Sequence, residues 1–533
     1  MIASHLSDAY EAAGEDPDAS ELRARACGAY MVAAERAEAI GAPEAAEAAY
    51  LKAVKLSSDD FERASFTERA GQMAAGAGWL ERAVDHFETA AAAHSGAGRV
   101  VDAARVIAGL GESLSALGRG ELAITRIREA LSSVDGTTPA PEVVADLQST
   151  LGGILIFSGQ RAEAYEAIEE ALTLAQHHQL AEPLAFGLDS KATLFNFAGR
   201  TDEAAALYEL SIAVARRHGI ARVEMRSEAN FADLCMTRDL PGAEEHAKAA
   251  LALARRWGHR GTEAFAAGNV IYVLSITGRI DEAFQLGNEL FEAGGDERPG
   301  AGDIHLKLAH LEALRGNVDA ARQHLSMCGT ESDDVQYRGV YASAEAAVLL
   351  AEADNIRALE VARAGIDEAL AGGLGVAHEV VRIALPIALE AAIEIGDLEE
   401  ADRLADLLVK RPAGEVPPFL RAQLMLAKAL VARARGVDED VEENLVGAEA
   451  TFRELGYPHW TARTQLDRAE WLAGQGRFDE STRLTTEAAA TFETSGVAPM
   501  LARARALLES ELVRDPGADD VHVVATSRPL HSQ

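Results

Sequence analysis

The stretch Phe197-Ala198-Gly199-Arg200-Thr201-Asp202-Glu203-Ala204 decides the fold, because its pattern recurs along the chain. An apolar or small residue, a glycine, polar residues and then Glu-Ala follow one another again at 157–164 and at 276–283. Weaker copies turn at Gly41, Gly78, Gly118, Asp239, Gly316, Asp354, Gly396, Gly436 and Gly476. The twelve turns lie 37 to 42 residues apart, so the chain is built from a repeat of about 40 residues.

Each repeat reads as a helix, a tight glycine turn and a second helix. Glycine ends the first helix because it takes a positive φ without a steric penalty. Thr201 and Asp281 follow their glycines closely, so we expect them to cap the second helix. One such pair cannot bury its apolar stripe alone, and neighbouring pairs must stack.

The sizes of the side chains follow the same phase. Seven residues before the turn the residue is small in ten of the twelve copies, and Ile271 and Leu389 are the exceptions. Five residues after the turn most copies have alanine, as at Ala164 and Ala204. Nine residues after the turn several copies have a bulky side chain, namely Tyr50, Phe87, Ile127, Ile168 and Tyr208. We expect the bulky side chain to fill the space that the small residue leaves between packed helices.

Composition and charge exclude several classes of protein. The 533 residues contain only 5% aromatics and are rich in alanine, leucine, glutamate and arginine, which favours helices over a sheet-based enzyme core. The formal net charge of −35 and the absence of a basic run argue against nucleic-acid binding. No signal peptide and no apolar stretch of membrane-spanning length is visible. Cys27, Cys235 and Cys328 are far apart, which predicts buried free thiols in a cytoplasmic protein.

These observations predict an all-α protein, a right-handed superhelical solenoid of about twelve antiparallel helix pairs. The small residue before the turn, the glycine, the alanine after it and the later bulky residue resemble the tetratricopeptide repeat, with a period of about 40 where that repeat has 34. The stretch from Ala33 through Gly41 to Gly71 resembles most closely the repeat arm of large bacterial adenylate and guanylate cyclases and maltose-regulator-type transcription factors, which contain an ATPase module.

Breaks in the repeat predict the domain organisation. The glycine-rich segment 293–303 is expected to be a flexible joint between an N-terminal lobe, residues 1–292, and a C-terminal lobe, residues 304–513. Residues 514–533 carry no repeat pattern and are expected to be a disordered tail.

No catalytic motif accompanies the repeats. The chain has no Gly-Lys-Ser/Thr for a phosphate-binding loop, no His-Glu-x-x-His and no Gly-x-Ser-x-Gly. The sequence therefore predicts a protein that is not an enzyme, with no metal site and no cofactor, and with neither nucleotide hydrolysis nor DNA binding.

The remaining candidate for function is the groove that the first helices would line. Nine residues before the turn four successive copies have Ser190, Asn230, Asn269 and Lys307, and three residues later they have Thr193, Asp233, Tyr272 and His310. Arg226 lies one helical turn before Asn230. In tetratricopeptide proteins an asparagine at this offset commonly holds the backbone or carboxylate of a bound peptide, and Asn230 and Asn269 match it. The other interpretation is that these polar residues only solvate the groove.

Two functions fit this pattern. The first is a non-catalytic scaffold that recognises a protein or peptide, with an anionic peptide end or small anionic ligand as the expected guest beside Arg226 and Lys307. The second is the ligand-sensing regulatory arm of an ATPase-type signalling regulator or nucleotide cyclase that lacks its output domain. Replacing Asn230 and Asn269 by alanine is expected to weaken binding and to leave folding unchanged.

Overall fold

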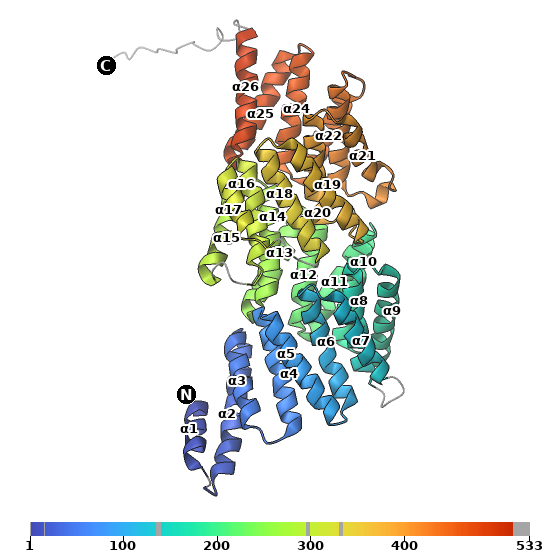
Figure 1. The fold of residues 1–533 in the computed structure, drawn as a ribbon. Helices are drawn as coiled ribbons and strands as arrows, with labels where there is room; N and C mark the ends of the chain where they lie inside the picture. The colour runs from blue at the N-terminus through green and yellow to red at the C-terminus, as the bar shows by residue number, and fades with distance from the viewer. Residues whose placement is uncertain (1, 15, 135–139, 295–298, 330–333, 515–533) are drawn as a thin grey trace, which may run out of the picture.

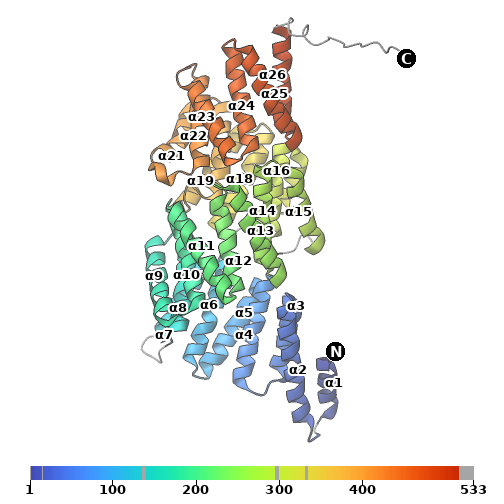
Figure 2. The same cartoon turned by 180° about the vertical axis from the view of Figure 1, so that it is seen from behind.

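The computed structural model describes residues 2–14, 16–134, 140–294, 299–329 and 334–514. Within these ranges the chain forms 26 α-helices, one short 3-10 helix (Ala413–Glu415) and no strand. The helices form an elongated stack with α1 and α2 at one end and α24 to α26 at the other (Figures 1 and 2). The helical repeat that the sequence predicts is therefore confirmed.

Twelve antiparallel pairs run from α2·α3 to α24·α25, and α1 and α26 cover the two ends. The first helices and their ends are α2 (Ala19–Ala39), α4 (Asp60–Ala77), α6 (Val100–Ala116), α8 (Pro141–Phe157), α10 (Ala181–Phe197), α12 (Ala221–Cys235), α14 (Arg260–Ile276), α16 (Ala301–Arg315), α18 (Val335–Ala351), α20 (Glu379–Glu394), α22 (Pro418–Ala434), α24 (Pro458–Gly474) and, unpaired, α26 (Ala498–Arg514). The second helices are α3 (Pro43–Leu56), α5 (Leu80–Gly96), α7 (Gly120–Val134), α9 (Arg161–His178), α11 (Thr201–His218), α13 (Leu240–Trp257), α15 (Ile280–Gly294), α17 (Val318–Ser326), α19 (Asn355–Ala371), α21 (Leu398–Val409), α23 (Val441–Leu455) and α25 (Phe478–Ser495), and α1 (Ile2–Ala13) precedes them.

The predicted turns are glycine turns at ten of the twelve positions. Every predicted turn glycine has a positive φ, for example 74° at Gly159 and 77° at Gly199. The two exceptions are the predicted aspartate turns. Asp239 and Asp354 have negative φ and accept backbone hydrogen bonds as N-caps of α13 and α19, and at the second of these turns Ala353 takes the positive φ of 61°.

The expected capping by Thr201 is wrong. Arg200 occupies the N-cap of α11 without a side-chain hydrogen bond, and Thr201 is already the first helical residue. Asp281 is likewise inside α15, which begins at Ile280. Each second helix begins two positions after its turn glycine. Thr201 stands at this first helical position and Asp281 one position later, so neither can be the N-cap, which precedes the helix. The favourable effect of Asp281 is therefore that of a carboxylate in the first turn of a helix.

Large side chains fill the spaces beside small ones, as the sequence predicts. A Cβ atom on Gly111 would lie 2.7 Å from Cδ1 of Ile127, and one on Gly71 would lie 3.0 Å from the ring of Phe87. A Cβ atom on Gly152 would lie 2.5 Å from Cγ1 of Ile168, on the second helix of the same pair. These bulky side chains are almost completely buried. These three pairs therefore pack through a glycine on the first helix and a bulky side chain on the second.

The superhelix is wound so tightly that successive turns touch. Gly41 contacts the backbone at Arg256 and Gly258, and Gly78 contacts Pro299. Further along, the turn at Gly199 lies against Glu415, where a Cβ atom on the glycine would be 2.9 Å from the Cα atom. These contacts join residues 215 to 221 positions apart, which corresponds to between five and six helix pairs per superhelical turn.

The predicted joint is only partly described. Residues 295–298 lie outside the described residues, Pro299 packs against Gly78, and α16 begins at Ala301. Helix α14 before the joint packs against α16 after it. The division into lobes 1–292 and 304–513 remains a prediction. The described chain ends with α26 at Arg514, and the rest of the predicted tail lies outside the described residues.

We expect Gly199→Val to destabilise α10 and α11 by about 3 kcal/mol. A β-branched residue is strained at positive φ, and its side chain would also collide with the backbone at Glu415. Hydrogen exchange should show loss of protection in α10, α11 and the segment around residue 415. Ala252→Val on an exposed position of α13 is the control. Equal effects of the two substitutions would contradict the proposed contact between superhelical turns.

Candidate binding surface on the inner face

The first helices form the inner face of the superhelix. Successive first helices pack on one another, as α6 does on α8 and α8 on α10. First helices also meet across the superhelix, because Arg222 of α12 donates to Glu112 of α6 at 2.5 Å. The same guanidinium donates to Glu182 of the neighbouring first helix, α10, at 2.9 Å. All nine predicted groove residues lie on α10, α12, α14 and α16, so they belong to one continuous strip of this face.

A buried carboxylate organises the first part of the strip. Asp189 on α10 is 0% exposed, and its Oδ2 lies 2.7 Å from Nε of Arg226 on α12. The amide nitrogen of Asn230 donates to both carboxylate oxygens, at 3.2 and 3.3 Å. Burial raises the pKa of Asp189, and Arg226 and Asn230 oppose this rise. The predicted residues Arg226 and Asn230 therefore hold α10 and α12 together.

The two predicted hydroxyl residues on α10 are also buried. The Thr193 hydroxyl donates to the Asp189 carbonyl at 3.1 Å and lies 2.9 Å from the hydroxyl of Tyr208. The Ser190 side chain is 0% exposed, and its hydroxyl has no hydrogen-bond partner among the described residues. Neither hydroxyl faces open solvent.

Asn269 and Asp233 bind other helices. The amide nitrogen of Asn269, which is buried on α14, donates at 3.0 Å to the backbone carbonyl of Ala229 on α12. Asp233 accepts a hydrogen bond of 2.6 Å from Arg382, whose guanidinium is almost fully buried on α20. Each amide bonds a buried group of the preceding first helix, so the premise that these amides make no contacts within the fold does not hold. We now expect the double substitution to lower stability as well.

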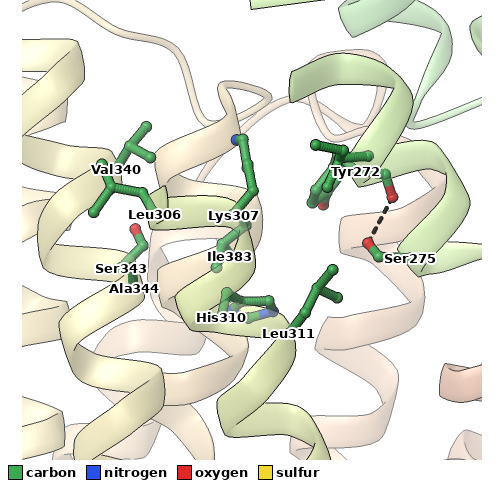
Figure 3. A pocket seen from close by; sticks show the side chains of 11 residues that line it. Tyr272, Ser275, Leu306, Lys307, His310, Leu311, Val340, Ser343, Ala344 and Ile383 are labelled. Atoms are coloured by element: carbon green, nitrogen blue, oxygen red, sulfur yellow. Dashed lines mark hydrogen bonds between the residues drawn. The ribbon is translucent and has the colours of Figure 1, made fainter. Parts of the chain in front are cut away.

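Tyr272, Lys307 and His310 line a small pocket between α14, α16, α18 and α20 (Figure 3). Lys307 forms an ion pair with Glu379, and burial lowers the pKa of Lys307 to about 8. Burial also lowers the pKa of His310 to about 4, with Lys307 acting in the same direction. The volume open to the centre of a water molecule is about 20 Å³, which is room for one or two waters.

Sequence reasoning missed the partners of the predicted residues. Each charged residue that the sequence proposes forms an ion pair inside the protein: Arg226 with Asp189, Lys307 with Glu379, and Asp233 with Arg382. A signal for Asp189 was present, since this carboxylate directly follows the apolar run Leu184 to Leu188. A lone carboxylate on such a helix requires a buried partner. The partner Arg382 is 149 residues from Asp233, so no local pattern indicates it.

A much larger cavity lies in the first superhelical turn, outside the predicted strip. The volume open to the centre of a water molecule is about 930 Å³. Six consecutive first helices, α2 through α12, contribute to its wall. Its charged lining residues are Glu38, Glu68, Glu112, Glu142, Asp146 and Glu182 against Arg69, Arg105 and Arg222. The wall therefore has an excess of negative charge.

The three arginines of this cavity are already paired. Arg69 pairs with Glu38, Arg105 with Glu68, and Arg222 with both Glu112 and Glu182. Among the described residues, Asp146 and Glu142 form no hydrogen bond or ion pair through their carboxylates. Burial raises the pKa of Asp146 to about 6, and Glu112, Glu182 and Glu142 raise it further against the opposing effect of Arg222.

The cavity also has apolar walls. Met73, Phe87, Val106 and Met225 line it together with Trp257, whose side chain is 40% exposed at the end of α13. His259 lies beside it and accepts a hydrogen bond from the backbone of Thr262 as the N-cap of α14. Burial lowers the pKa of His259, so this histidine adds no positive charge near neutral pH.

Other features of the described chain can be stated briefly. Cys27, Cys235 and Cys328 are buried free thiols, as predicted. Within the described ranges no group of three His, Cys, Asp or Glu side chains is placed to hold a metal ion. No described helix combines the length and the apolar character needed to cross a membrane.

Among solved structures, the chain is similar to several helical proteins at low sequence identity. No family model matches the chain, and no curated protein matches it. A Rap protein complexed with competence and sporulation factor is 11% identical, with a TM-score of 0.47, over 65% of this chain and 98% of that one. Cut9-Hcn1, an APC/C hetero-tetramer, matches at 11% identity and a TM-score of 0.48, over 92% of this chain and 94% of that one. Yeast Tom70 matches at 12% identity and a TM-score of 0.32, over 93% and 98%. These likenesses assign no family to the chain.

Proposed function

We propose that this protein is a non-catalytic interaction scaffold that receives a segment of a partner protein on the inner face of its superhelix. The observation that carries the proposal is the 930 Å³ cavity enclosed by six successive first helices. Its volume is at the upper end of the range for ligand sites, and its lining combines apolar side chains with a few charged ones, as binding sites do. A solenoid offers such a concave surface as a direct consequence of stacking its repeats.

The predicted strip at Asn230, Asn269 and Lys307 is the second candidate surface for a partner. The charges and amides there are engaged by Asp189, Ala229 and Glu379. An incoming peptide would have to break these contacts, whereas the carboxylates of Glu142 and Asp146 in the first-turn cavity are not engaged. We therefore place the partner segment in the cavity and keep the strip as a support that fixes the helices around it.

The alternative function, a ligand-sensing arm of an ATPase-type regulator or cyclase, remains a prediction, as does the cytoplasmic location. A sensor at the predicted residues needs space for its ligand, and the pocket beside Lys307 and His310 holds only water-sized guests. The absence of duplex DNA binding is a further part of our proposal, which the charge of −35 supports.

Photo-crosslinking tests which face receives the partner. A photoreactive amino acid is placed at Gln72 on α4 or Ala116 on α6, which are exposed and line the cavity. The matched control is Asp85, which is exposed on α5, the second helix of the same pair as α4. We expect both cavity positions to label one defined segment of one protein in native lysate, and the control to label none of it. Labelling of that segment from Asp85 alone would contradict the proposal.

A further inference from the structure

We propose that the first-turn cavity recognises a basic, extended segment of a partner protein, with an arginine or lysine side chain bound at Glu142 and Asp146. This inference rests on the proposed function and adds the chemistry of the partner. It reverses the charge that the sequence alone predicts for the guest, because Arg226 and Lys307 are neutralised inside the protein.

Geometry places the two carboxylates on one face. Glu142 and Asp146 are four residues apart on α8, so their side chains are neighbours one helical turn apart, and both line the cavity. Two like charges at this spacing repel each other and cost stability. Among the described residues no cation forms an ion pair with either of them. Arg222 opposes the rise in the pKa of Asp146, but its own ion pairs are with Glu112 and Glu182. An arriving guanidinium or ammonium group would remove this repulsion.

Charge balance across the whole cavity points to the same guest. Six carboxylates face three arginines, and each arginine is already paired. A cationic segment therefore meets complementary charge, while an acidic one would have to displace an internal ion pair. The net charge of the whole chain would also accelerate the approach of a basic partner.

The apolar walls determine the rest of the segment. Trp257 is large, rigid and 40% exposed, and Met73 and Met225 are flexible and adapt to different shapes. The exposed indole of Trp257 attracts both apolar groups and cations. A partner that places an apolar residue and a cation side by side therefore gains affinity from each of the two. We infer a segment in which basic and aliphatic residues alternate, bound in a groove that several first helices share.

Two fluorescein-labelled nonapeptides test the inference by fluorescence anisotropy at physiological salt. One repeats alanine, leucine and arginine, and the other has glutamate in place of arginine. The cavity variant is Glu142→Gln with Asp146→Asn, which removes two charges and the repulsion between them. The control variant, Glu439→Gln with Glu443→Gln, removes the same charge from two exposed residues at the start of α23, with the same spacing of four residues.

We expect the arginine peptide to bind the wild-type protein. Its affinity for the cavity variant should be about tenfold lower, and its affinity for the control variant should lie within about twofold of the wild-type value. Equal weakening in both variants would show attraction to net charge alone and overturn the site. No binding of the arginine peptide at about 100 μM would overturn it as well. Tighter binding of the glutamate peptide would overturn the basic chemistry while leaving the proposed function intact, whereas crosslinks confined to Asp85 would remove the proposed function itself.

Discussion

Arg226→Met is expected to lower the stability of the α10–α12 region by about 3 kcal/mol. The substitution keeps an unbranched apolar stem but removes the guanidinium, and it leaves the fully buried Asp189 without its cation. A buried carboxylate that loses its partner has to carry an uncompensated charge or take up a proton, and both cost free energy. Because a solenoid is stabilised by nearest-neighbour contacts, the loss should appear first in α10, α12 and the helices packed on them.

Hydrogen exchange and urea unfolding measure this effect, and a second substitution separates its causes. Adding Asp189→Asn to Arg226→Met removes the buried charge, retains an acceptor for Asn230, and should restore most of the lost stability. Arg483→Met on the exposed pair with Glu487 is the control and should change stability by less than about 0.5 kcal/mol. If Arg226→Met were as mild as the control, Arg226 would be free for a ligand, as the sequence suggests.

Acid is expected to destabilise the protein strongly between pH 6.5 and 4. Burial lowers the pKa values of His310, His378 and His459 to about 4. In the unfolded chain histidine titrates near 6.5, so below that pH the unfolded state binds more protons than the folded state. The stability that the neutral histidines contribute is therefore complete above pH 6.5 and is lost as the pH falls toward 4. At pH 5 each histidine accounts for a loss of about 2 kcal/mol.

Other groups modify this loss without reversing it. Lys307 lowers the pKa of His310, Asp233 opposes the lowering at His378, and Glu390 opposes it at His459. Asp146 acts in the opposite sense to the histidines, because its raised pKa of about 6 means that the folded state gains a proton on acidification. The raised pKa values of Asp189 and Asp303 act in the same sense as that of Asp146, whereas the lowered pKa values of His94 and His259 add to the loss. With five histidines against three aspartates, the net result at pH 5 is a destabilisation.

Urea unfolding midpoints at pH 7.5, 6 and 5 measure this dependence. His310→Leu is the informative variant because Nδ1 of His310 has no hydrogen-bond partner among the described residues, so little else is removed. The dependence on pH should become shallower by the share of one histidine, about 2 kcal/mol between pH 7.5 and pH 5. An unchanged slope in this variant would contradict the burial of His310, and a flat profile in the wild type would contradict all three assignments.

The repeat and its internal packing could be predicted because they are local. Glycine and a bulky residue at fixed distances from each turn predict that Gly152 meets Ile168, and they do meet. The same local pattern says nothing about how strongly the stack curves, since curvature sums small differences at every pair interface. The contact between Gly41 and Gly258 is one result of that sum. It gives the turn glycines a second function, close approach of the backbone between superhelical turns, beyond the positive φ that the sequence indicates.

The candidate site could be predicted only in part, for a similar reason. The offset of Asn230 and Asn269 correctly places them on the inner strip of first helices, but a polar residue on this strip can bind a ligand or the neighbouring helix. Asn269 donates to the backbone of Ala229, which no sequence pattern distinguishes from donation to a peptide. The first-turn cavity brings together residues from Glu38 to His259, so it exists only once the superhelix has closed its first turn.

Hydrogen–deuterium exchange with the crosslinked partner segment, prepared as a synthetic peptide, tests the central claim most directly. Binding on the inner face predicts added protection in α4, α6, α8 and α12, which carry the cavity wall, and little change in α7, α9 and α11, none of which lines the cavity. It also predicts that this protection is lost with Glu142→Gln and Asp146→Asn and retained with Glu439→Gln and Glu443→Gln. Protection confined to the second helices would contradict the account and place the partner on the outer face.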